Sequence, residues 1–206
     1  MNGPVDNVTR RTNPEVVSPM RTRKAVGILI AVGALVAACA RLPQANASTA
    51  SFDALVVDGV IRLRAATRAY QSLDSAVAAG YPKTVAQCLV HEHHGAMGYH
   101  HVNRDHVDAK LEIEKPEILL YERLEDGAYH LNGVEYIVPF AAWSRDSTPP
   151  TLMGRKMMRE DNLKIWYTHV WAWTDNKDGL FANFNPSVQC LGADRKVYTP
   201  TVDTGQ

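Results

Sequence analysis

The stretch ILLYERLEDGAYHLNGVEYIVP, residues 118–139, decides the predicted fold because it contains extended segments joined by a tight turn. Apolar and aromatic residues dominate 118–124 and 129–131. Between these segments lies Asp126-Gly127, a dipeptide favoured in two-residue hairpin turns. Strands joined by such a turn pair antiparallel. The sequence therefore predicts an antiparallel sheet in the middle of the chain.

Further extended segments follow this hairpin. Asn132-Gly133 predicts a bulge or kink ahead of a strand over 134–138, and Pro139 ends that strand because it has no backbone N–H to donate. Residues 163–174, LKIWYTHVWAWT, are the strongest strand signal because they are rich in aromatic and β-branched residues. Residues 144–154 are rich in Ser, Thr, Pro and Gly and predict a loop between the strands.

Residues 51–79 predict a helix ahead of the sheet. Mostly apolar residues recur there every three or four positions, which places them on one helical face: Val56, Val60, Leu63, Thr67, Tyr70, Leu73 and Val77. Ser51 suits the start of the helix, and Gly80-Tyr81-Pro82 is a stop signal. The predicted fold class is therefore α+β, with a long N-terminal helix packed on an antiparallel sheet in a loop-rich domain.

Composition and charge limit the number of domains and the class of partner. The chain has 206 residues, of which 46% are hydrophobic, enough for one core but hardly two. The chain has 22 basic and 22 acidic residues, and residues 1–47 contain six of the basic and two of the acidic ones. Residues 48–206 therefore have 16 basic and 20 acidic residues, a net charge of −4. A mildly acidic domain without a basic stripe predicts no nucleic-acid partner.

The N-terminal region predicts export from the cytoplasm. A basic segment, 21–24, precedes the uncharged apolar run 25–40, which is the pattern of a secretory signal. The run is shorter than the roughly 20 apolar residues that a spanning helix needs. Ala45-Asn46-Ala47 predicts cleavage after Ala47, so residues 1–47 are a signal peptide with an N-terminal extension and 48–206 are a single globular domain.

An alternative processing site lies within the same signal. Residues 36–39, VAAC, resemble a bacterial lipobox, which would leave Cys39 lipidated at a new N-terminus. The membrane would then be a partner only through the signal peptide or this anchor. Both alternatives predict an extracytoplasmic protein, whether secreted, periplasmic or associated with the cell envelope.

The cysteines predict one disulfide. Removal or lipidation of Cys39 leaves Cys88 and Cys190, and an even pair in an oxidising compartment favours a disulfide over two free thiols. The rival interpretation is a zinc site built from Cys88, His91 and Cys190, because Cys88-x-x-His91 has suitable local spacing.

Several motifs resemble an uncharacterised family of exported bacterial proteins. They are ATRAYQSLDSAVAAGY (66–81), GAMGYHHVN (95–103), KPEILLYE (115–122), GVEYIVP (133–139), HVWAW (169–173) and NPSVQC (185–190). The resemblance spans Ala66–Cys190 and implies no reaction. Within its G-M-G-[YF]-H-[YF]-V-N pattern, His100 matches and His101 departs from an aromatic residue. The cluster His91, His93 and His94 lies outside the pattern.

Six of the eight histidines lie between 91 and 106, which predicts a metal site. Neutral imidazole is the commonest protein ligand for zinc and copper. In an extended segment His91 and His93 point to one face and His94 to the other, so one ion would not bind all three without a turn. The predicted ligands are His100, His169 and Glu135, a two-histidine, one-carboxylate set with open positions.

A second group of residues is predicted to assist that set: His91, His93, His94, His101 and Met97. Thioether and imidazole together suit copper outside the cytoplasm, so copper is slightly favoured over zinc. The alternative without a metal is that each histidine is an ordinary half-buried residue with one hydrogen bond, and that the methionine side chain contributes only to packing. No HExxH or G-x-S-x-G motif is present, so the sequence predicts no reaction and leaves enzyme activity open.

An alternative function is a metal-free module that binds a ligand or partner through an aromatic face. Strand alternation over 165–173 places Tyr167, Trp171 and Trp173 on the same face as His169. The favoured interpretation of this face is the core beneath the helix.

Overall fold

The computed structural model describes residues 47–82 and 87–198, with side chains from Asp53 onward. The predicted export signal lies outside these residues except for Ala47, and so does Cys39. Among the described helices, none combines the length and the apolar character that crossing a membrane requires.

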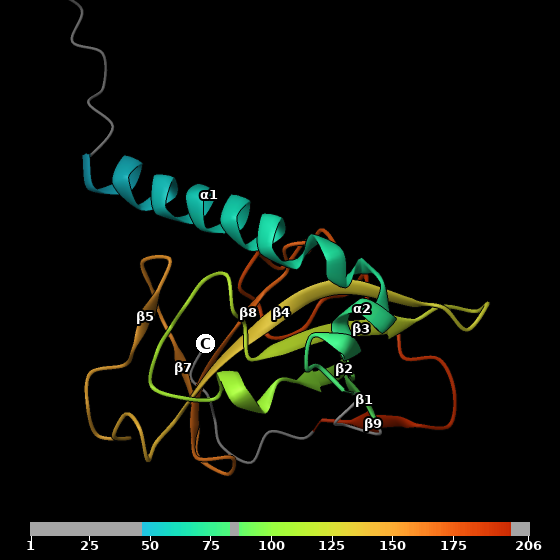
Figure 1. Cartoon of the computed structure of the whole chain (residues 1–206). Coiled ribbons are helices and arrows are strands. Elements are labelled where there is room, and N and C mark those ends of the chain that lie inside the picture. The colour runs from blue at the N-terminus through green and yellow to red at the C-terminus, as the bar shows by residue number, and fades with distance from the viewer. Residues whose placement is uncertain (1–46, 83–86, 199–206) are drawn as a thin grey trace, which may run out of the picture. The chain divides into compact units, whose positions relative to one another are not determined.

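A seven-stranded sheet forms the centre of the described chain (Figure 1). In spatial order it consists of β7 (Met158–Glu160), β8 (Ile165–Val170), β4 (Tyr129–Pro139), β3 (Ile118–Arg123), β2 (Gly95–Val102), β1 (Cys88–His91) and β9 (Arg195–Val197). All neighbours are antiparallel except β1 and β9, which are parallel. A separate hairpin, β5 (Thr151–Leu152) and β6 (Arg155–Lys156), begins inside the predicted loop. The predicted antiparallel sheet is confirmed.

The predicted hairpin and bulge are also confirmed. β3 and β4 form this hairpin, but its loop is longer than the predicted two residues, because the N–H of Gly127 donates to the carbonyl oxygen of Leu124 and the N–H of Leu124 donates to that of Ala128. Gly127 has a φ of +86°, a value that favours glycine. The pairing register shifts where Leu120 lies opposite Gly133 and Tyr121 lies opposite Leu131. Asn132 is therefore the extra, bulged residue of β4.

The predicted helix over 51–79 is wrong as a single element. The structure has three pieces: α1 (Ala47–Thr67), the 3₁₀ helix η1 (Arg68–Gln71) and α2 (Leu73–Ala78); a second 3₁₀ helix, η2 (Arg104–His106), follows β2. Ser72 has an extended backbone, with φ −88° and ψ 119°, and its side chain accepts a hydrogen bond from the backbone N–H of Ser75. Because this N-cap begins a new helix, it ends the preceding one.

Helical residues cover one face of the sheet. Leu63 of α1 packs in a cluster with Val134 and Tyr136 of β4. Nε1 of Trp173, which follows β8, donates to Oγ1 of Thr67 at 3.0 Å. The prediction of a helix packed on one sheet face is confirmed by these contacts, although the helix is interrupted.

The opposite face of the sheet carries a second apolar cluster, which contains Ile118, Leu120, Ile137, Tyr167 and Trp171. The interpretation of Tyr167 and Trp171 as core beneath the helix is therefore wrong. Trp173 lies on the other face from Tyr167 and Trp171, because β8 ends at Val170 and strand alternation no longer holds after that residue.

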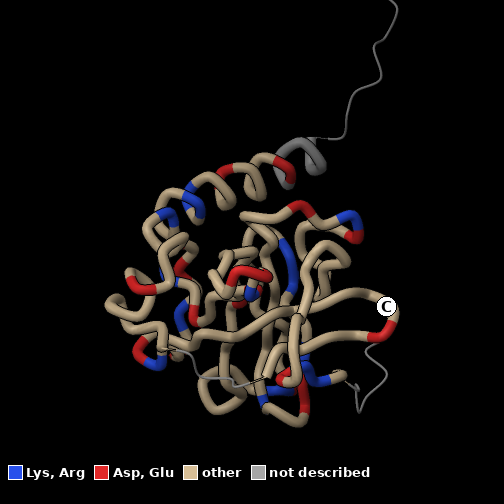
Figure 2. The backbone as a smooth tube through the Cα atoms, turned by 90° about the vertical axis from the view of Figure 1, so that its right-hand side faces the viewer, with Lys and Arg blue, Asp and Glu red and all other residues tan. Residues whose placement is uncertain are grey.

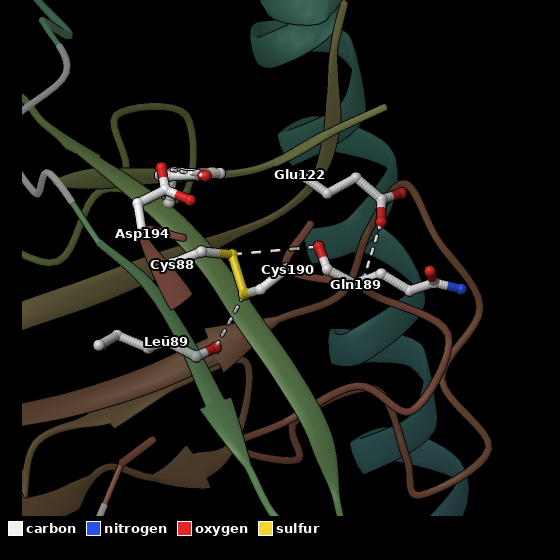
Figure 3. The surroundings of a disulfide bond; sticks show 7 residues. Cys88, Leu89, Glu122, Gln189, Cys190 and Asp194 are labelled. Atoms are coloured by element: carbon white, nitrogen blue, oxygen red, sulfur yellow. Dashed lines mark hydrogen bonds between the residues drawn. A yellow bond between two sulfur atoms is a disulfide. The ribbon is translucent and has the colours of Figure 1, made fainter. Parts of the chain in front are cut away.

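The predicted Cys88–Cys190 disulfide is confirmed (Figure 3). It joins β1 to a segment 102 residues later in the chain. Beside it, the backbone N–H of Gln189 donates to Glu122 of β3 at 3.0 Å. Because both sulfurs are bonded to each other, the rival zinc site with these cysteines and His91 is wrong. Disulfides persist in oxidising compartments, so this bond is typical of proteins outside the cytoplasm.

Charged residues of both signs lie on the same elements, α1 among them (Figure 2). Several form exposed ion pairs: Arg62 with Glu114 at 2.6 Å and Arg145 with Asp161 at 2.7 Å. Such exposed pairs contribute little stability, typically below about 1 kcal/mol each. The absence of a nucleic-acid partner stays a prediction.

Candidate metal centre

Three different strands position the three predicted ligands. His100 lies on β2, Glu135 on β4 and His169 on β8. Glu135 and His169 are directly opposite each other in the β4–β8 ladder, so their side chains share one face. His100 is separated from β4 by β3, on which Ile118 pairs with Glu135. All three side chains lie on the face opposite the helices.

The ligand atoms of these three residues converge. Nε2 of His100 lies 3.5 Å from Oε2 of Glu135, and Nε2 of His169 lies 3.9 Å from the same oxygen. One ligand atom from each residue lies within 4.8 Å of the other two. Ligands that surround zinc tetrahedrally, at about 2.0–2.2 Å from the ion, are about 3.3–3.6 Å apart. The observed set fits an ion after side-chain adjustments of about 1 Å or less.

All three side chains are buried, and some of the ring nitrogens lack ordinary hydrogen bonds. His100 is 7% exposed, Glu135 6% and His169 1%. Within the described chain, Nδ1 of His100 and both ring nitrogens of His169 have no hydrogen-bond partner of normal geometry. Buried polar groups in folded proteins are nearly always bonded, so the unpartnered Nε2 of His169, 3.9 Å from the Glu135 carboxylate, requires an explanation. A bound cation supplies one.

Burial also sets the protonation of the site. Desolvation lowers the pKa of His100 to about 4 and that of His169 to about 3, effects that Gly98 and Asn183 respectively oppose only in part. Both rings are therefore neutral at pH 7, the form that binds metals. Desolvation, followed by the charge of Glu117, raises the pKa of Glu135 to about 8. A cation would favour its ionised form and relieve this cost.

A cavity of about 310 Å³ opens onto the three ligands. Apart from them, apolar side chains make up most of its wall, including Leu89, Met97, Val102, Ile118, Ile137 and Ile165. Tyr198, just after β9, donates its hydroxyl to Glu160 of β7 at 2.8 Å. Because β9 and β7 are the two ends of the strand order, this bond shows that the sheet curls around the cavity.

The residues predicted to assist the site are mostly elsewhere. Met97 lines the cavity together with His100. His91 ends β1, and His93 and His94 follow in the turn before β2; the rings of His91 and His94 are 4.6 Å apart. None of these three lines the cavity or joins the converging group of the described chain.

His101 also lies apart from the site. It is on the helix-facing side of β2, where its Nδ1 is 3.3 Å from the carbonyl oxygen of Tyr81 and its ring packs on Tyr121. Successive residues of a strand face opposite ways, so His100 and His101 could not both reach one ion. His101 is an ordinary core residue.

Sequence reasoning missed one buried carboxyl, Glu117. It is 1% exposed, its Oε2 accepts from the backbone N–H of Ile137 at 3.2 Å, and burial raises its pKa to about 8. Its charge also raises the pKa of Glu135. A signal was present, because Glu117 directly precedes the apolar run 118–121, much as Glu135 interrupts another such run.

Chemically, three protein ligands leave at least one coordination position of an ion open. That pattern is typical of sites that bind an exogenous ligand, in contrast to closed structural sites. Comparisons with models of known families, with curated proteins and with solved structures find no match for this chain. The assignment therefore depends on geometry alone, and the family resemblance stays a prediction.

Proposed function

We propose that the protein is an extracytoplasmic metal-binding protein that holds one transition-metal ion with His100, Glu135 and His169. The observation that carries the proposal is the convergence of three buried ligand atoms within 4.8 Å at the wall of one cavity. Unpartnered ring nitrogens and a carboxyl whose pKa is raised by burial support it.

Zinc and copper are the metals that this ligand set fits best. Two imidazoles with one carboxylate suit either ion in its divalent form. Met97 lines the same cavity, and its thioether would favour copper, above all in the cuprous state. The disulfide withholds both described cysteines from the metal.

The proposed location is secreted, periplasmic or associated with the cell envelope. A basic segment followed by an apolar run is the pattern of an export signal, and the disulfide is typical of an oxidising compartment. Cleavage after Ala47 and lipidation of Cys39 are the two processing routes.

A metal-free ligand-binding module is the second candidate, and the 310 Å³ cavity favours it. The aromatic surface first suggested for such a module does not exist as one face, because Trp173 lies on the helix side. In this version Glu135 is protonated and donates to an imidazole, and the cavity binds its ligand without an ion.

The proposal is tested by metal stoichiometry in protein that is exported and purified without a histidine tag. Elemental analysis and calorimetric titration with Zn²⁺ and Cu²⁺ should each find one ion per chain. His100→Ala and His169→Ala should each abolish this binding because each removes one of only three ligands. Circular dichroism and the unfolding midpoint establish that each variant is folded.

The matched control changes three histidines outside the cavity. The triple variant His91→Ala, His93→Ala and His94→Ala should keep one ion per chain, with affinity weakened only slightly. A wild-type protein that binds no metal overturns the proposal. Loss of the ion in the triple variant alone, with both single variants loaded, places the site in the β1–β2 turn instead.

A further inference from the structure

We propose that the cavity beside the three ligands binds a small monocarboxylate with an apolar tail, whose carboxylate occupies the open position of the metal ion. This inference rests on the proposed function and names the class of ligand for the same site. It follows from the wall of the cavity, its charge and its volume.

The wall offers an apolar surface with one polar end. Ile118, Ile137 and Ile165 line it from three neighbouring strands, and Met97 and Val102 line it from β2. Water on such a wall is readily displaced by hydrocarbon, which is the main driving force for binding an apolar tail.

The polar groups of the wall outside the metal ligands are already paired within the protein. The Tyr198 hydroxyl donates to Glu160, and Asn183 donates to the Tyr167 hydroxyl at 3.0 Å. A sugar or another polyhydroxyl ligand would therefore bury hydroxyl groups against hydrocarbon without partners. Polar recognition is concentrated at His100, Glu135 and His169.

Charge complementarity selects the head group. A divalent ion bound by one carboxylate and two neutral imidazoles has a net charge of +1, and it is buried beside apolar side chains. Glu160, the other carboxylate of the wall, is only partly buried and accepts from Tyr198. One negative charge on the ligand neutralises this site, whereas a dianion such as a phosphate monoester would leave a buried excess charge. A carboxylate oxygen is also an ordinary ligand for zinc and copper.

The volume selects a small occupant. About 310 Å³ is at the lower end of the range for small-molecule sites, about 300–1,000 Å³. A short aliphatic acid fits this space, whereas a peptide strand or a long lipid chain does not. Hexanoate is therefore a suitable probe.

The test uses the full mature protein with Co²⁺ in place of the native ion, because the visible absorption of Co²⁺ reports its coordination. Metal stoichiometry is measured first, and hexanoate, acetate and hexan-1-ol are then titrated separately. Hexanoate should change the Co²⁺ absorption spectrum and bind at least about tenfold more tightly than acetate, because each buried methylene strengthens binding. Hexan-1-ol has no charge and should leave the spectrum unchanged.

Two matched variants separate the cavity from the metal. Ile165→Phe adds bulk to the cavity wall, whereas Ile61→Phe makes the same change on the exposed side of α1, where Ile61 is 63% exposed. Both should keep one Co²⁺ per chain. Ile165→Phe should weaken hexanoate binding at least about tenfold with little effect on acetate, and Ile61→Phe should change neither.

The outcomes distinguish failure of the proposed metal site from failure of the proposed carboxylate ligand. If the protein binds no Co²⁺, Zn²⁺ or Cu²⁺, the proposed function and the inference both fail. If it holds the ion but hexanoate leaves the spectrum unchanged, or binds no better than acetate, the metal site stands and the inference is wrong. Equal affinity of metal-free protein for hexanoate also overturns the inference and supports the metal-free module.

Discussion

Removal of the metal should give the protein an unusual dependence of stability on pH, because four buried groups then have shifted pKa values. Burial raises the pKa of Glu117 and Glu135 to about 8, and it lowers the pKa of His100 to about 4 and that of His169 to about 3. At pH 6.5 His100 and His169 are about half protonated in the unfolded chain and neutral in the folded state, so between pH 6.5 and 8 they raise stability by about 0.8 kcal/mol in total. The two carboxyl groups differ more between the folded and unfolded states and have the opposite effect.

In that window the folded state binds more protons than the unfolded state, because the unfolded carboxyl groups ionise near pH 4.5. The free energy of unfolding therefore falls as pH rises from 6.5 to 8. Each raised pKa contributes about 1.36 kcal/mol per pH unit below that pKa and less as the group ionises near pH 8, so one carboxyl group lowers stability by about 1.6 kcal/mol and the pair by about 3 kcal/mol. After the histidine contribution is subtracted, the net fall is about 2.5 kcal/mol. From pH 4.5 to 6.5 the two histidines have the opposite effect and cancel this slope.

Urea unfolding of metal-free protein in EDTA, at several pH values between 6.5 and 8, measures this fall. Glu135→Gln removes one of the two groups and should reduce the fall to about 1 kcal/mol, and Glu117→Gln should do the same. Zinc-loaded protein should lose the contribution of Glu135, since the ion holds that carboxylate ionised. The reasoning is refuted if wild-type stability is flat or rises across this window, or if Glu135→Gln keeps the full slope.

Three further predictions concern covalent and backbone features. Replacing Cys88 and Cys190 by alanine should lower the free energy of unfolding by about 4–5 kcal/mol in urea, because the two cysteines are 102 positions apart in the sequence. A loss below about 1 kcal/mol would contradict this. In Gly133→Ala the new Cβ would lie 2.7 Å from the carbonyl oxygen of Val170, so β4 and β8, which position Glu135 and His169, would have to shift. Metal affinity measured by calorimetry should therefore fall at least about tenfold, and an unchanged affinity would contradict this prediction. Intact-mass measurement of exported protein should find Ser48 at the terminus rather than an uncleaved chain.

Local sequence signals were sufficient for the sheet and the disulfide. The hairpin at Asp126-Gly127 and the Asn132-Gly133 bulge depend on backbone preferences of a few adjacent residues, so their positions were predictable, although the loop of the hairpin is longer than two residues. The cysteine pairing followed from the small number of candidates. The interruption of the helical segment at Ser72 was missed, because apolar periodicity continued through a local N-cap that favours a new start.

The site itself was only partly predictable. Strand alternation indicated that His169 lies on one face of its strand and Glu135 opposite to Val134 and Tyr136. No local rule showed that His100 would reach them across an intervening strand, because that approach depends on the curl of the whole sheet. The curl in turn depends on contacts between distant edges, such as Tyr198 with Glu160, which have no sequence signature.

The bulge in β4 links the local sequence to the site. Leu131 faces the helices, and so does Val134, although they are three positions apart and regular alternation would place them on opposite faces. The extra residue, Asn132, accounts for this change of phase, and its carbonyl oxygen accepts from the backbone N–H of Trp173 at 2.9 Å. Without the bulge, Glu135 would point into the core beneath the helices. With it, the carboxylate lies beside His169, so the dipeptide that shapes the strand also assembles the ligand set.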